Sequence, residues 1–190
     1  MKTKKLRIGA TLFGLVSIFA LNSCNSIPNG ATAVKNFDKS KYLGKWYEIA
    51  RLDFKYEKNL NNTTANYSLN TDNTIKVVNR GFNYKTHQWK EAIGKAKSAG
   101  KADEAKLKVS FFGPFYSGYN VIAIDPEYRY ALVVGKSLKY MWILSRTTVI
   151  PETIKKEYLQ KAKAIGYNTD ALIWVEHNQN KNLIDELCNQ

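Results

Sequence analysis

The side chains best suited to chemistry in this sequence are few and widely separated. The two histidines, His87 and His177, lie far apart, and neither has a second ligand at metal-binding spacing. The chain has no glycine-rich phosphate loop and no G-x-S-x-G nucleophile motif. Glu48 and Asp53 could form a carboxylate pair, but their odd spacing along a strand places them on opposite faces. We therefore expect no catalytic residues, no metal site and no cofactor.

One cysteine stands in a context that predicts covalent modification. Four basic residues among the first seven precede an apolar run over residues 8–21. This run is shorter than the roughly 20 residues of a membrane-spanning helix and has the length of a secretory signal. The following Leu21–Cys24 resembles the bacterial lipobox, in which a peptidase cuts before a lipid-modified cysteine. We predict a signal peptide over 1–23, a lipidated Cys24 and a flexible tether over 24–36. The alternative is an ordinary signal peptide beside a chance cysteine.

The second cysteine and the net charge depend on the same prediction. If Cys24 carries lipid, Cys188 has no partner and the fold has no disulfide; otherwise a bond between them is an option. Loss of the four basic signal-peptide residues lowers the formal charge from +13 to +9. This charge favours an anionic phospholipid surface, or simply reflects a solvated lysine face. Nucleic acid is not expected as a partner, because the chain carries no nucleic-acid-binding motif.

The body of the chain has the pattern of short strands separated by turns. Eight segments rich in aromatic and branched residues cover 46–54, 63–69, 74–79, 87–97, 107–111, 119–124, 128–134 and 140–145. Short connections such as 125–127 and 135–137 favour antiparallel hairpins. We predict an all-β fold, an eight-stranded antiparallel up-and-down barrel, as a single domain over 37–177. A polar tail over 178–190 follows it.

One helix is expected after the eighth strand. Pro151 and Glu152 suit its first turn, and Gly166 suits its C-terminal cap. The residues between them place an apolar stripe on one face, formed by Ile154, Tyr158, Ala162 and Ile165. This stripe predicts that the helix packs against another part of the protein. A short final strand is expected over 171–175.

Three segments resemble the signature motifs of the lipocalin family, in the same order and spacing. Gly44–Arg51 is similar to the G-x-W motif that opens the first barrel strand. Asp125–Tyr128 is similar to the acidic, tyrosine-containing turn between two later strands. Trp142–Arg146 is similar to the final motif with its arginine. The chain over about 37–177 is thus identified as a member of the lipocalin family, most similar to its bacterial lipocalin and apolipoprotein D branch.

The resemblance implies structural roles for five motif residues. Trp46 would close one end of the barrel, and Arg146 would pack on its face. Gly44 would allow a tight approach into the first strand, while Asp125 and Tyr128 would form the later turn. The alternative is that Trp46 and Arg146 contact a ligand.

The resemblance also implies an open cavity, and strand alternation indicates which side chains face it. The candidates are Tyr67, Val77, Asn79, Val109, Phe111, Tyr119, Tyr140 and Trp142. This apolar and aromatic wall suits a long acyl chain, with tyrosine hydroxyls or Asn79 available to a carboxylate or phosphate head. Lys85 or Lys139 could assist an anionic head at the rim. The alternative is a filled core without a cavity.

The sequence leaves more than one function open. The resemblance implies a lipid-anchored, non-enzymatic protein of the outer membrane, with its barrel facing the periplasm. Such a protein would store or transport fatty acids such as palmitate, or lysophospholipids. The alternatives are a structural protein with a closed barrel and an isomerase-type enzyme on the same barrel. The segment Phe111–Tyr116 is unusually apolar and could line the mouth, contact the membrane or form a homodimer surface.

Overall fold

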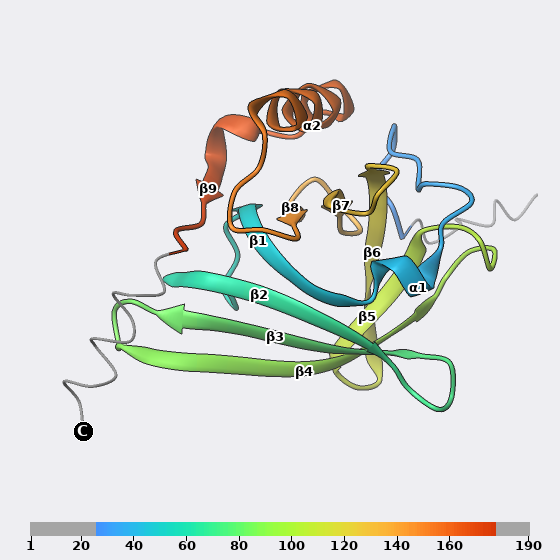
Figure 1. Cartoon of the computed structure of the whole chain (residues 1–190), viewed down its shortest axis with the longest axis horizontal. Coiled ribbons are helices and arrows are strands. Elements are labelled where there is room, and N and C mark those ends of the chain that lie inside the picture. Colours follow the sequence, from blue (N-terminus) through green and yellow to red (C-terminus); the bar gives the residue numbers. More distant parts are fainter. Residues whose placement is uncertain (1–25, 178–190) are drawn as a thin grey trace, which may run out of the picture.

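The computed structural model describes residues 26–177 (Figure 1). Its strands are β1 (Gly44–Leu52), β2 (Leu60–Leu69), β3 (Ile75–Asn83), β4 (Gln88–Ser98), β5 (Lys106–Phe112), β6 (Phe115–Ile124), β7 (Tyr130–Val134), β8 (Met141–Ser145) and β9 (Leu172–Trp174). Its helices are α1 (Lys39–Tyr42), α2 (Glu152–Ile165) and the 3-10 helix η1 (Thr169–Ala171). The predicted signal peptide, Cys24, Cys188 and the C-terminal tail lie outside the described residues. Within residues 26–177, no helix has the length and apolar character to cross a membrane.

The sheet closes on itself into a barrel. Consecutive strands pair antiparallel from β2 to β8, and β1 lies between β8 and β2. Tyr47 shows the closure, because it is opposite Thr64 on one side and Ser145 on the other. The predicted eight-stranded up-and-down barrel is therefore confirmed, and the short β9 pairs additionally with the end of β1. A barrel of this strand number leaves an interior wide enough for one small ligand.

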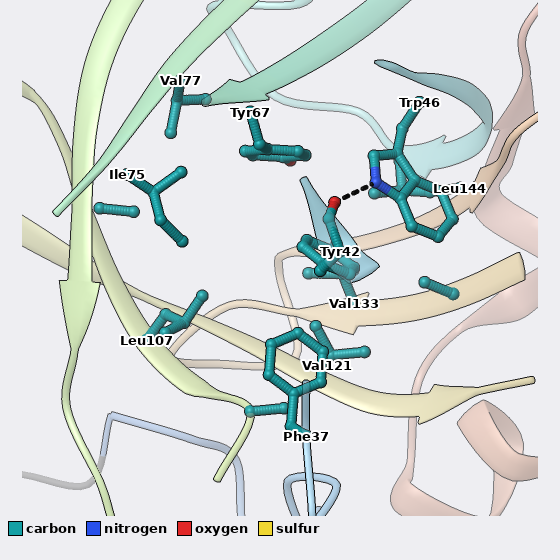
Figure 2. Close-up of a cluster of buried hydrophobic side chains, with 13 residues drawn as sticks. Phe37, Tyr42, Trp46, Tyr67, Ile75, Val77, Leu107, Val121, Val133 and Leu144 are labelled. Carbon is teal, nitrogen blue, oxygen red and sulfur yellow. Dashed lines mark hydrogen bonds between the residues drawn. The ribbon is translucent and has the colours of Figure 1, made fainter. Parts of the chain in front are cut away.

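Two apolar cores lie on either side of the barrel wall. The inner core includes Trp46, Ile75 and Leu144 (Figure 2). The outer core lies between the wall and α2, whose buried residues are Tyr158 and Ala162. Figure 1 shows α2 outside the barrel, as its apolar stripe predicts. The helix ends at a left-handed glycine, which satisfies its last carbonyl groups.

A β-bulge in β1 sets the direction of its side chains. The pairing of β1 with β8 shifts register between Glu48 and Ala50. Ile49 and Ala50 both join the outer core as a result, although they are adjacent in sequence. Arg51 then returns to the side of Glu48, three residues earlier. A bulge has this effect because it inserts one residue into the strand alternation.

Residues 26–36, expected from the sequence to be a flexible tether, lie against the barrel instead. Val34 bridges two segments of the wall: its N–H donates to Val121 O at 2.9 Å, and its carbonyl accepts from Ala105 N at 2.8 Å. Nearer the start, Asn120 Nδ2 donates to Ser26 O at 2.8 Å. Ala33 is buried. This segment is thus part of the folded body, because it satisfies backbone groups on the wall.

Candidate ligand-binding cavity

One end of the barrel is closed by stacked aromatic rings. Trp46 is fully buried, and its Nε1 donates to Tyr42 O at 2.8 Å, as Figure 2 shows. The guanidinium of Arg146 lies 3.9 Å from the centre of the Trp46 ring. Gly44 has a φ of +93°, and a Cβ there would lie 3.4 Å from Arg146 Nη1. The positive φ therefore favours glycine at this position, while the space beside the arginine would admit a Cβ in ordinary contact.

Arg146 holds the closed end together through backbone carbonyl groups. Its guanidinium donates to the carbonyls of Lys41, Leu43 and Lys45 at 2.8 to 2.9 Å. Its Nε donates to Tyr128 O at 3.1 Å. These contacts join the end of β8 to the approach into β1. They give Arg146 a structural position beneath the cavity.

The Asp125–Tyr128 turn is tied to the same end. Asp125 Oδ1 accepts from Tyr130 N at 2.7 Å, and Oδ2 accepts from Arg129 Nε at 3.0 Å. These hydrogen bonds outweigh the effect of partial burial and lower the pKa of Asp125 below its usual value. The Tyr128 hydroxyl accepts from Asp38 N at 2.7 Å. The turn therefore anchors the segment that leads into α1.

Three tyrosine hydroxyls form a chain just above the closed end. Tyr119 Oη lies 2.6 Å from Tyr42 Oη and 2.8 Å from Tyr67 Oη. Burial raises the pKa of all three tyrosines, so each hydroxyl stays neutral. The three hydroxyls hydrogen-bond to one another, and they leave a weakly polar base to the cavity.

Above the tyrosines, the barrel encloses a cavity of about 470 Å³. The structure places all eight candidates from the sequence on its wall: Tyr67, Val77, Asn79, Val109, Phe111, Tyr119, Tyr140 and Trp142. Whether these side chains contact a ligand stays a prediction. Asn79 Oδ1 and Thr63 Oγ1 are buried there and have no hydrogen-bond partner among the described residues.

A polar patch that sequence reasoning missed joins β1, the β1–β2 connection and β8. Arg51 Nη1 donates to Glu48 Oε1 at 2.7 Å, and Nη2 donates to the carbonyls of Glu57 and Leu60 at 2.8 and 3.0 Å. Trp142 Nε1 donates to Glu57 Oε2 at 3.0 Å. Burial raises the pKa of both glutamates, and that of Glu57 well above its usual range.

Part of this patch had a sequence signal. Glu48 lies two residues from Trp46, and the strand period places both on the inner face. Arg51 had no such signal, because the bulge changes its phase. Asp53, the partner considered for Glu48, is exposed, and Glu57 from the next loop takes its place.

The other end of the barrel is open and aromatic. Phe54, Tyr56, Phe112, Phe115 and Tyr116 line it, from the β1–β2 connection and the β5–β6 hairpin. The aromatic residues of the segment Phe111–Tyr116 thus line the mouth.

The basic residues that line the cavity differ from the two lysines suggested by the sequence. Neither Lys85 nor Lys139 is among the lining residues, whereas Lys90 and Arg80 are, together with the acidic Glu91. Lys90 is opposite Gly81 across β3 and β4, two residues before Ala92, which is opposite Asn79. The two-residue period therefore turns Lys90 inward at the open end.

Residues 26–177 contain no group of three or more histidine, cysteine or acidic side chains placed to hold a metal ion. His177 lies outside the cavity, with Nε2 2.8 Å from Glu48 O. The geometry is that of a largely apolar cavity with one closed end and one open end.

The sequence and the fold match known proteins. Residues 37–177 match the family model of the lipocalin-like domain. The chain is 47% identical over 173 residues to the outer membrane lipoprotein Blc of Citrobacter freundii, which covers 90% of this chain and 98% of that protein. Rat apolipoprotein D is 37% identical over 159 residues, covering 76% of this chain and 80% of that protein. Insecticyanin of the tobacco hornworm, a solved structure, aligns with a TM-score of 0.66 at 20% identity, covering 81% of this chain and 88% of that one. That last likeness concerns the fold alone.

Proposed function

This chain belongs to the lipocalin family, and we propose that it stores or carries fatty acids or lysophospholipids in the cell envelope. The observation that carries the proposal is the cavity of about 470 Å³, which is closed at one end and open at the other. Its volume lies within the range of small-molecule sites. Its aliphatic and aromatic walls favour an acyl chain, because burial of apolar surface drives such binding.

The orientation of the ligand follows from the charges in the wall. The interior holds Glu48 and Glu57, and the cation beside them, Arg51, already has three hydrogen-bonded oxygen partners. A deeply placed carboxylate or phosphate would lie near these groups without a free cation, at a high desolvation cost. Lys90 provides a positive charge at the open end. We therefore place the acyl chain inside the barrel and the anionic head at the mouth.

The cellular location is proposed from the relatives and the leader sequence together. The curated bacterial relatives carry the name outer membrane lipoprotein. The proposal for this chain is a signal peptide over 1–23, lipid on Cys24 and a barrel that faces the periplasm. Stable anchoring needs more than one acyl chain, which a lipoprotein cysteine provides.

Binding is proposed rather than catalysis, and an open barrel rather than a closed one. The relatives are named as lipocalins and lipoproteins. The open cavity favours a carrier over the structural protein with a filled barrel. No described side-chain arrangement favours the isomerase alternative.

The test is a titration of the delipidated chain with palmitate and with lysophosphatidylcholine, followed by tryptophan fluorescence. Residues 26–177 contain every strand of the barrel and both of its cores, so residues 25–190 retain the folded body. Saturable quenching at micromolar concentration or below is expected. Trp142→Phe should remove the signal, because Trp142 lines the cavity. The matched control Trp174→Phe should keep it, because Trp174 lies on β9 outside the cavity.

The outcome against the proposal is a flat titration in a protein that circular dichroism shows to be folded. A flat result with both ligands would favour a closed barrel and a role in protein interaction.

A further inference from the structure

Exposed aromatic side chains surround the open end of the cavity and form what we call the rim. The rim consists of Tyr56, Phe112, Phe115 and Tyr116, which are 58, 67, 79 and 38% exposed. Tyr56 lies in the β1–β2 connection and Phe112 at the end of β5, and their ring centres lie 6.0 Å apart. The rim is therefore one continuous apolar surface rather than scattered single residues. A surface of this kind on a folded protein indicates a partner.

Lysine ammonium groups lie over both tyrosines of the rim. Lys55 Nζ is 4.7 Å from the centre of the Tyr56 ring. Lys97 and Lys108 lie 4.7 and 5.7 Å from the centre of the Tyr116 ring. Aromatic rings beside lysines suit the interface of an anionic bilayer, where rings settle among the head groups and ammonium groups meet phosphates. A protein partner is a poorer match, because lysine is depleted from the cores of protein interfaces.

The start of the described chain lies on the same strand pair as the rim. Ser26 O accepts a hydrogen bond from Asn120 on β6, the strand that begins at Phe115. Lys108 on β5 is opposite Gly118 on β6, between these two points. The described chain therefore starts on the wall that carries the rim.

We infer that the rim docks on a bilayer that contains anionic phospholipid, with the open end of the barrel against the head groups. This contact goes beyond the lipid anchor, because the folded barrel itself makes it. Its consequence is that an amphiphile passes between bilayer and cavity without its acyl chain crossing bulk water. The rim thus fixes which end of the barrel faces the membrane.

Vesicle binding by the delipidated chain tests the rim separately from the anchor. Residues 25–190 are sedimented with vesicles of phosphatidylcholine alone or with added phosphatidylglycerol. Binding is expected on the anionic vesicles, and added salt should weaken it. Phe112→Ser with Phe115→Ser should lower the partition coefficient about tenfold or more, because two apolar side chains lose their burial in lipid. The matched control is Leu69→Ser with Ile93→Ser, which removes two other exposed apolar side chains and should change little.

Two charge-reversal variants test whether vesicle binding depends on the lysines beside the rim. Lys108→Glu should lower binding to anionic vesicles about fivefold or more, since a lysine near such a surface contributes about 1 kcal/mol. Lys161→Glu makes the same charge change on α2 and should have a smaller effect.

Three results would overturn the inference. The first is equal binding by the rim variant and its control, and the second is equal binding to neutral and anionic vesicles. The third is a concentration-dependent dimer in sedimentation velocity that the rim variant abolishes, with no vesicle binding by the unmodified sequence. These experiments use no monomeric ligand. Their failure would therefore leave the acyl titration unaffected, and a flat acyl titration would leave the docking result unaffected.

Discussion

Arg51→Met is expected to lower the free energy of unfolding by about 3–5 kcal/mol at neutral pH. Arg51 is 1% exposed and donates to the Glu48 carboxylate and to the carbonyls of Glu57 and Leu60. Methionine fills a similar volume but leaves Glu48, which is 5% exposed, as a buried carboxylate without its cation. It also leaves two carbonyl groups without these donors. A buried charge that loses its partner bears the full desolvation cost, which sets the size of the loss.

The loss should depend on pH in a defined direction. Burial already raises the pKa of Glu48, and Arg51 partly offsets that rise. Without Arg51 the folded-state pKa moves further above the unfolded value. Such a carboxyl contributes stability that is complete below the unfolded pKa and is lost as pH rises through the folded pKa. The deficit of Arg51→Met should therefore be smaller at about pH 5 than at about pH 8.

Urea unfolding followed by circular dichroism measures this deficit by linear extrapolation. Adding Glu48→Gln to Arg51→Met removes the unpaired charge, so the double variant should recover most of the loss. A single variant that loses less than about 1 kcal/mol would place the pair among weak surface salt bridges and refute the reasoning. A loss of the same size at both pH values would refute it as well.

Three further predictions concern single positions. Glu57→Gln should stabilise the protein in urea melts at alkaline pH but not at acid pH. Burial raises the folded-state pKa of Glu57, so the stability that this carboxyl contributes at acid pH is lost as pH rises through that pKa. A gain in stability at acid pH would contradict this. Gly44→Ala should cost about 1–2 kcal/mol in thermal unfolding, because its φ is +93°, and an unchanged melting temperature would count against it. Lys90→Gln should weaken palmitate binding in fluorescence titrations and spare an uncharged monoacylglycerol. Equal weakening of both ligands would place the head elsewhere.

Strand alternation predicted correctly which side chains face the cavity wherever the strand pairing is regular. In β8, Trp142 and Leu144 line the cavity, while Met141 and Ile143 belong to the outer core. The whole barrel could be predicted because this two-residue period recurs in strand after strand and short turns separate the strands.

The remaining features depend on contacts that no local pattern records. The bulge after Glu48 brings Arg51 into the polar patch, and the sequence around it reads as an uninterrupted strand. Residues 26–36 are polar enough to be taken for a tether, yet Val34 completes its hydrogen bonds on distant segments. Lys90 faces the opening because of its register against Gly81, which depends on the neighbouring strand. Register and bulges are tertiary properties, so composition alone does not specify them.

The contacts of Arg146 also determine when the barrel can close during folding. The carbonyl groups that it binds, on Lys41, Leu43 and Lys45, precede it by 101 to 105 residues. In addition, one edge of β1 pairs with β8, so this edge stays unpaired until β8 has formed. A chain that emerges N-terminus first therefore keeps one edge of β1 unpaired until nearly all of the barrel has been released. Contacts of such long sequence separation make closure slow, and during that interval the open strand edge is the part of the chain most exposed to aggregation.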